Sequence, residues 1–426
     1  MATSQETATP SAQVLAATRP ASLRVLMVAP TSFFGHYGGH IRIVEEVRAL
    51  QALGHEVTVV TYYKGEDVDG VRIVRTRRLP WRADYEVGSS RHKLAFDLYL
   101  LWRVLRFGFQ WRPHLVHGHM HEGALIGGLL ARLLRVPLVF DFQGSLTGEM
   151  LDHGFVRRDS PAFRGWSALE RFICRLPDTI LTSSVQAGEL LRNQFGVAGE
   201  RIAALPDCAD LNHFAPGVAS PEAHADLRRR FGIPADRHIV AYLGLLAEYQ
   251  GTEHLLQAAA RLKASGDDVH FLIMGYPKVD YYRTLARQME VDDHVTFTGR
   301  VDYYRHAPLY LSLGDVAVSP KFSATEGSGK VLNYMAMGQP VVAYDTPVHR
   351  EYLGDAGVYV PPGDVDAFAG AIRELLADRA RRQELGRALR QRAASYYSWD
   401  VAGRRIDAVY RRLVQQQSSL RNRETV

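Results

Sequence analysis

Apolar residues gather in short runs that alternate with amphipathic segments along most of the chain. The run LRVLMVAP at residues 23–30 is short and almost wholly apolar, which is typical of a strand buried on both faces. The following segment, residues 41–54, carries apolar residues at helical spacing and stops at Gly54. Because strand and helix patterns keep alternating, the sequence predicts parallel sheets covered by helices on both faces.

The alternation stops once and then starts again. Residues 207–223 are rich in proline, alanine, aspartate and glycine, which is typical of a linker. We therefore predict a leader without structure at 1–22, a first domain at 23–206, a linker at 207–223 and a second domain at 224–395. A last helix at 396–416 and a tail without structure at 417–426 complete the prediction. Each domain is expected to be Rossmann-like.

Composition narrows the class of protein. Hydrophobic residues make up 46% and charged residues 23% of the chain, as in an ordinary globular protein. The two cysteines, Cys174 and Cys208, lie too far apart in sequence to indicate a disulfide framework or a metal-ligand motif, so we expect a cytoplasmic protein. The net charge is +5, but its arginines are spread along the chain, so we expect no nucleic-acid partner.

One apolar segment raises the question of a membrane. Residues 91–111 form an apolar helix pattern with a single polar stripe that includes Tyr99, Arg103 and Arg106. The segment either packs inside the first domain or lies on a membrane, and its wide apolar arc favours burial. Peripheral contact with the inner face of the plasma membrane is the alternative. No apolar stretch reaches the ~20 residues that a spanning helix needs.

The string TEGSGKVLNYMAMG carries the clearest candidate chemistry. It links the strand pattern at 316–320 to a helix pattern that ends at Gly338. Open N–H groups at a helix start bind anions, and Gly327 and Gly329 would let a phosphate approach the backbone. Lys330 adds a positive charge, and Glu326 can accept hydrogen bonds from sugar hydroxyls. The string indicates a sugar diphosphate site; the alternative is an ordinary helix start capped by Ser328.

Several longer strings share a family resemblance. MAMGQPVVAYDTP, GVYVPPGDVDAFAGAIRELL and YYSWDVAGRRIDAVY in the second half, with YGGH and HLVHGHMHEGALIGGLLAR in the first, resemble the family 4 retaining glycosyltransferases of the GT-B fold. The resemblance covers roughly residues 23–414. It implies two Rossmann-like domains facing across a cleft. The first would hold the acceptor, the second a nucleotide-sugar, and the last helix would return to the first domain.

The resemblance also implies functional residues. His119 corresponds to the cleft histidine of the family, and the implied catalytic residues are His119, Glu326 and Lys330. The implied substrate-binding residues follow the two glycine motifs: Gly38, Gly39, Gly327, Ser328, Gly329, Val331 and Asn333.

The chain departs from the family pattern at two places. Of the usual pair of acids spaced by seven residues, at least one is missing, since the pair falls on Thr325 and Asn333 in one register and on Glu326 and Tyr334 in the other. Leu245 and Gln250 stand where the family has an arginine and a lysine that grip the diphosphate. We expect Lys330 to replace part of that lost charge.

These observations lead to one expected function and to alternative functions. We expect a metal-independent retaining glycosyltransferase without a cofactor, which moves a sugar from a nucleoside diphosphate, UDP or GDP, to a hydroxyl of a glycan, a lipid-linked sugar or a small molecule. A non-catalytic GT-B protein that binds nucleotide-sugar or glycan is an alternative, as is an epimerase or phosphorylase on the same fold. The two D-x-D strings, at 67–69 and 364–366, lack convergent ligands and indicate a turn and a helix cap rather than a metal site.

Overall fold

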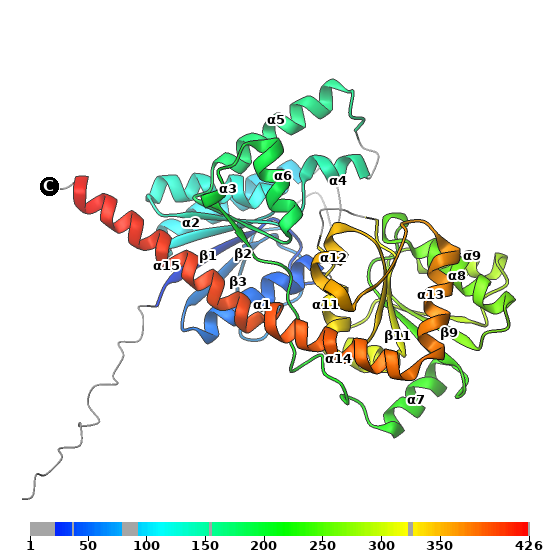
Figure 1. Ribbon diagram of the computed structural model, residues 1–426. Helices are drawn as coiled ribbons and strands as arrows, with labels where there is room; N and C mark the ends of the chain where they lie inside the picture. The colour runs from blue at the N-terminus through cyan, green and yellow to red at the C-terminus, as the bar shows by residue number, and fades with distance from the viewer. Residues whose placement is uncertain (1–21, 36–37, 79–92, 153–155, 323–326, 425–426) are drawn as a thin grey trace, which may run out of the picture.

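The computed structural model describes residues 22–35, 38–78, 93–152, 156–322 and 327–424, and forms two α/β domains (Figure 1). The first domain contains a seven-stranded sheet of order β3-β2-β1-β4-β5-β6-β7, and the second a six-stranded sheet of order β10-β9-β8-β11-β12-β13. All neighbouring strands in both sheets run parallel. The two Rossmann-like domains expected from the sequence are confirmed.

The elements of the first domain are the strands β1 (Arg24–Ala29), β2 (Glu56–Thr61), β3 (Arg72–Arg75), β4 (Leu115–His119), β5 (Leu138–Phe142), β6 (Thr179–Thr182) and β7 (Ile202–Ala204), with the helices α1 (Gly38–Ala52), α2 (Lys93–Trp111), α3 (Met120–Leu134), α4 (Leu146–Asp152), α5 (Pro161–Arg175) and α6 (Val185–Phe195). The second domain has the strands β8 (His238–Leu243), β9 (Val269–Met274), β10 (Val295–Gly299), β11 (Val316–Ser319), β12 (Val341–Tyr344) and β13 (Val358–Val360). Its helices are α7 (Pro221–Phe231), α8 (Thr252–Ala264), α9 (Val279–Gln288), α10 (Ala307–Leu311), α11 (Gly329–Ala336), α12 (Pro347–Leu353), α13 (Val365–Ala377), α14 (Arg379–Tyr396) and α15 (Trp399–Glu424).

The first sheet is buried on both faces, as the apolar strand runs predict. Along β1, Val25 and Met27 belong to a core that includes α1 and α15. Leu26 and Val28, which point to the other face, pack with α2 and α3. All four side chains are fully buried, because β1 pairs with β2 on one side and β4 on the other.

The helix α2 is less buried than its apolar arc suggested. One stripe, Phe96, Leu100 and Val104, is buried against the first sheet, four residues apart as helical packing requires. Leu98 and Trp102 on the outer side remain exposed. The helix therefore packs in the first domain as favoured from the sequence, but its outer apolar side chains stay exposed.

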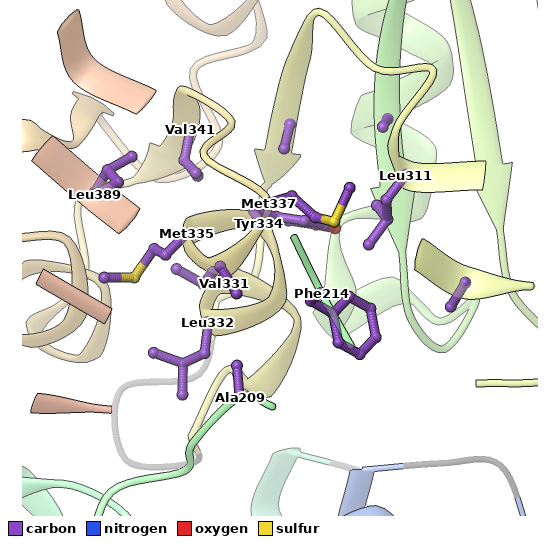
Figure 2. Close-up of a cluster of buried hydrophobic side chains, with 14 of the residues drawn as sticks. Ala209, Phe214, Leu311, Val331, Leu332, Tyr334, Met335, Met337, Val341 and Leu389 are labelled. Atoms are coloured by element: carbon purple, nitrogen blue, oxygen red, sulfur yellow. The ribbon is translucent and has the colours of Figure 1, made fainter. Parts of the chain in front are cut away.

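In the second domain, α11 is surrounded by core. Val331, Leu332 and Met335 of α11 are fully buried, and they pack with side chains such as Phe214 and Leu389 (Figure 2). The apolar run after Lys330 is therefore a helix enclosed on most sides. Its enclosure fixes the start of α11 relative to β11, where the glycine string lies.

The last helix, α15, joins the two domains by packing along α1 (Figure 1). Ile406 and Tyr410 are fully buried there, and a Cβ added at Gly403 would lie 2.9 Å from the Cβ of Ala49. The helix continues through Glu424, beyond the expected end at residue 416, because residues 404–424 contain no glycine or proline to stop it. The expectation of an unstructured tail from residue 417 is corrected accordingly.

Side-chain hydrogen bonds also connect the domains. The Tyr352 hydroxyl donates to the Ser183 carbonyl at 2.9 Å, and the Tyr304 hydroxyl donates to Glu45 at 2.6 Å. Each of these bonds joins a residue of the first domain to one of the second. None of the described helices combines the length and apolarity needed to cross a membrane.

We expect Ile406→Ala to lower the free energy of unfolding by about 2–4 kcal/mol, since it leaves a cavity between α15 and α1. Urea denaturation would measure the change. Arg404→Ala, at an exposed position of the same helix, is the matched control and should stay within about 0.5 kcal/mol of the wild type. Equal, small effects of both substitutions would show that α15 does not contribute to the stability of the first domain.

Candidate active site in the interdomain cleft

A cavity of about 240 Å³ lies between the domains. From the second domain it is lined by the loops that follow β8, β9 and β11, with residues such as Gly244, Gly275 and Lys321. From the first domain it is lined by the start of α1 and by Gln143, just beyond β5. The cavity thus lies at the carboxyl ends of the strands, beside the switch point between β8 and β11, where open α/β sheets bind ligands.

Two helices begin at this cavity, each with glycines. Gly38 and Gly39 open α1, and Gly329 opens α11. At Gly327 a Cβ would lie 2.4 Å from an Asp207 carboxylate oxygen, so a larger residue there would force the Asp207 side chain to shift. The Ser328 side chain makes no capping hydrogen bond to α11, which corrects the alternative of an ordinary capped helix start. Both helix starts can therefore present backbone N–H groups to an anion.

Two of the described lining residues are lysines. The Lys330 ammonium donates to the Gln250 side chain at 2.5 Å and lies 4.5 Å from the ring centroid of Tyr242. The Lys321 ammonium donates to the Gly327 carbonyl at 2.8 Å. Sequence reasoning missed Lys321, although its position directly after the β11 strand pattern was a usable signal.

The sequence-predicted residues divide into those at the cavity and those elsewhere. Asn333 lines the cavity, and its side-chain oxygen accepts a hydrogen bond from the Tyr303 hydroxyl at 2.9 Å. Val331 does not line it, because its side chain lies in the core below α11. Glu326 and Thr325 lie outside the described residues. The cavity brings together the remaining glycine, serine and lysine positions: Gly38, Gly39, Gly327, Ser328, Gly329 and Lys330.

His119 does not reach the cavity wall. It ends β4, is fully buried, and its Nδ1 lies 3.1 Å from an Asp141 carboxylate oxygen. The parallel register places Asp141 of β5 directly beside His119, so the carboxylate holds the imidazole inside the domain. Gln143, which does line the cavity, donates to the same carboxylate at 2.7 Å. The expected cleft histidine thus lies one layer behind the cavity.

Arg42 connects these groups to the linker. Its guanidinium donates to Asp141 at 2.8 Å, to Asp207 at 2.9 Å and lies 3.0 Å from Glu46. We call Arg42, Glu46, Asp141, Asp207 and His119 the Arg42 cluster. Burial opposes ionisation of Asp141, but the guanidinium outweighs it and lowers the pKa of that carboxyl below its usual range. Burial and the nearby Asp141 charge raise the pKa of Glu46 well above its usual range.

Glu46, His117 and His119 could each offer one ligand atom to a metal ion, within 4.8 Å of one another. The Glu46 carboxyl already lies 3.0 Å from the Arg42 guanidinium, and its raised pKa favours the neutral acid, a poor ligand. His117 Nδ1 is hydrogen-bonded to the Tyr410 hydroxyl at 2.7 Å. We therefore interpret the group as a buried polar network and assign no metal to it.

The two D-x-D strings have structural roles. The Asp364 side chain caps α13 by accepting a hydrogen bond from the Ala367 N–H at 2.9 Å. Asp67 forms an ion pair with Arg75 at 2.7 Å. The turn and cap expected from the sequence account for both strings.

Comparison with known proteins agrees with this geometry. Residues 38–208 match the model of the glycosyl transferase 4-like domain, and residues 224–392 match that of glycosyl transferases group 1. The α-D-kanosaminyltransferase of Streptomyces kanamyceticus is 31% identical over 74% of this chain and 82% of its own length. This chain belongs to the group 1 glycosyltransferases. It is therefore an enzyme of the glycosyltransferase class.

Other relatives cover more of the chain. The glycogen synthase of Mycobacterium tuberculosis is 27% identical over 91% of this chain and 94% of its own length. Among solved structures, sucrose-phosphate synthase from Thermosynechococcus elongatus superposes with a TM-score of 0.78 at 21% identity, over 92% of this chain and all of the other. The Anabaena protein HepE in complex with UDP-glucose has a TM-score of 0.73 at 15% identity, with 92% and 100% covered. These structures share the GT-B fold of this member of the group 1 family.

We expect Arg42→Met to lower the free energy of unfolding by about 3–5 kcal/mol, because it leaves buried carboxylates without a compensating charge. Arg48→Met is the matched control on the same helix: Arg48 pairs with Glu45, its side chain is 40% exposed, and the expected cost is below about 1 kcal/mol. Urea denaturation would compare them. An Arg42→Met variant as stable as Arg48→Met would mean that the buried acids simply take up protons.

His349 predicts a dependence of stability on pH. It lies behind the glycine string, where its Nδ1 donates to the Tyr344 carbonyl and its Nε2 accepts from the Ser319 hydroxyl. Burial, partly opposed by the Tyr344 bond, lowers the pKa of His349 from 6.5 to about 4. Below pH 6.5 the unfolded chain therefore binds a proton that the folded chain does not, and stability falls as the pH falls toward 4.

Between pH 7.5 and 5.0 the wild type should lose about 2 kcal/mol more unfolding free energy than His349→Gln, which cannot titrate in this range. Urea denaturation at both pH values tests the difference. Identical losses in the two proteins would rule out His349 as the titrating group.

Proposed function

We propose that this glycosyltransferase moves a sugar, with retention of anomeric configuration and without a metal ion, from a UDP- or GDP-sugar to a hydroxyl of a glycan, a lipid-linked sugar or a small molecule. One observation carries the proposal. Two glycine-bearing helix starts and two lysines surround one cavity at the carboxyl ends of the strands. That arrangement matches a diphosphate that carries a sugar on one side and a nucleoside on the other.

The diphosphate would lie against the first turn of α11, between Lys330 and Lys321. The Lys330 ammonium lies 2.5 Å from the Gln250 side chain, so its charge stands beside a position where the family has a lysine. Leu245 also lines the cavity and adds no charge. Lys330 thus replaces the cation lost at Gln250, and Lys321 is a second cation of the same site. Relatives of this fold have been solved with UDP-glucose or with ADP, which supports a nucleotide-sugar donor.

The reaction would use these charges in the transition state. The bond between the anomeric carbon and the phosphate oxygen breaks while the acceptor oxygen forms the new bond on the same face. The acceptor proton passes to the departing phosphate. Negative charge grows on that phosphate as the sugar becomes oxocarbenium-like, so fixed cations and N–H groups stabilise the transition state more than the bound donor. In this scheme no metal ion is needed to neutralise the leaving group.

The remaining predicted residues take supporting parts. Glu326 would accept hydrogen bonds from hydroxyls of the donor sugar, and Asn333 would bind the ribose. His119 is assigned as a positioning residue rather than a catalytic one, because it acts through the Asp141 carboxylate on Gln143 at the cavity wall. Gln143 would then contact the transferred sugar or the acceptor.

Incubation of the purified enzyme with UDP-, GDP- and ADP-sugars tests the proposal. Binding is measured by thermal shift, the product by mass spectrometry, and its anomeric configuration by NMR. We expect transfer from a UDP- or GDP-sugar, retained configuration, and unchanged rates with EDTA. An inverted product, or activity that EDTA abolishes, would contradict the mechanism.

Lys330→Ala should cost roughly 2–3 kcal/mol in transition-state stabilisation, or about two decades in kcat/KM. The attraction between an ammonium and a diphosphate at contact is roughly 4 kcal/mol at an effective dielectric near 20, and desolvation removes part of it. Lys330→Arg should recover only part of the loss because its fork differs from a point charge. Lys263→Ala, where Lys263 pairs with Asp293 on the surface, should retain wild-type kinetics. Full activity of Lys330→Ala would show that helix N–H groups and Lys321 suffice.

A further inference from the structure

Three neighbouring helices of the first domain share an exposed apolar face. On α2, Leu94, Leu98 and Trp102 follow one another at four-residue spacing and are 77%, 65% and 46% exposed. On α3, which packs between α2 and α5, the same spacing exposes Leu125, Leu129 and Leu133. The helix α5 adds Trp166, Leu169 and Phe172. We call these nine side chains the outer apolar face.

The outer apolar face is distinct from the buried core of the first domain. Each helix buries a different stripe against the sheet or its neighbours: Phe96 and Leu100 on α2, Leu130 on α3, and Ile173 on α5 are buried. The outer apolar face is therefore a second apolar surface on helices that already have one. Groups of exposed large apolar side chains of this extent mark sites that bind a protein or a membrane.

The charged residues on the same three helices indicate whether this face binds a protein or a membrane. Each helix has one acidic residue, and each is engaged: Asp97 accepts from the Tyr62 hydroxyl, Glu122 pairs with Lys93, and Glu170 is buried. Two arginines are exposed beside these apolar stripes: the Arg106 guanidinium lies 5.4 Å from the Trp102 ring centroid on α2, and Arg132 follows Leu129 by three residues on α3. The described part of this surface thus combines apolar and cationic side chains with hardly any free carboxylate from its own helices.

We propose that the outer apolar face docks on a bilayer that contains anionic phospholipid. Leucine and phenylalanine would enter the acyl boundary, Trp102 and Trp166 would lie at headgroup depth, and the arginines would contact lipid phosphates. A second copy of the chain is a poorer occupant, because a two-fold interface would bring the arginines of both copies together without facing acids. The face binds from one side, since no described helix can span the bilayer. The proposal does not depend on the proposed reaction.

Flotation with lipid vesicles tests this surface. The full-length wild type should float with vesicles of phosphatidylcholine and phosphatidylglycerol, and much less with phosphatidylcholine alone. Leu98→Ser combined with Trp102→Ser and Leu129→Ser should lower the partition coefficient at least about tenfold, because the apolar area entering the bilayer falls. Tyr281→Ser is the matched control, since Tyr281 is 55% exposed on the second domain, and should float like the wild type.

A second set of variants tests the charge. Arg106→Gln combined with Arg132→Gln should lower binding to the anionic vesicles about tenfold, with thermal unfolding midpoints checked against the wild type. Added salt should weaken the wild type in the same direction. Wild-type protein that does not float, or a triple serine variant that floats as well as wild type, would overturn the proposal. So would light scattering that shows a dimer which the serine substitutions dissociate, since the face would then be an interface between copies.

Discussion

The buried charge of Arg42 is the constraint on which the cleft depends. A guanidinium enclosed this deeply must be matched by negative charge, which Asp141 at the end of β5 and Asp207 where the chain leaves the first domain supply. Glu46 on the same helix is a further close polar neighbour. Because the Arg42 cluster is satisfied only when α1, the sheet and the linker meet, it fixes where the second domain begins. Asp207 in turn packs against Gly327, so the same charge balance positions the glycine string.

The two sides of the cleft differ in charge. The first-domain wall under α1 is built from paired acids and one arginine, whereas the second domain contributes two lysines and the start of α11. In the proposed reaction, this charge difference would attract the diphosphate toward the second domain and leave a neutral sugar against Gln143 and the start of α1. The second domain would then bind the donor and the first domain the acceptor. Leu245 adds no charge to the cavity, and the two lysines reach it from the chain that follows β11.

Helices cover the two faces of the first sheet in different ways. The helices α1 and α15 close one face of the sheet with a continuous core, and their interface includes the close approach of Gly403 to Ala49. On the other face, α2, α3 and α5 bury one stripe each and leave another in contact with solvent. When a helix is apolar on two sides, its sequence does not tell which side packs in the core, because either side could be the buried one.

The sequence by itself determined the architecture and the position of the glycine string. Short apolar runs that alternate with amphipathic helix patterns indicate strands of a sheet covered on both faces, and a glycine string between such a strand and the next helix lies at the carboxyl edge of the sheet. Gly38, Gly329, Lys330 and Asn333 were therefore found from the pattern and from the family resemblance. The strand β7 escaped notice because three residues at a sheet edge carry no periodicity.

Only the tertiary structure decided which polar groups face the cavity. His119 stands at a strand end in sequence, yet Asp141 on the adjacent strand and Arg42 on α1 hold it behind the cavity wall. Lys321 is one of six lysines in the chain and enters the site because its side chain bends back to the Gly327 carbonyl. Burial of a polar side chain depends on the charges that neighbouring elements bring to it, and those contacts join residues about a hundred positions apart in the chain, as between Arg42 and Asp141.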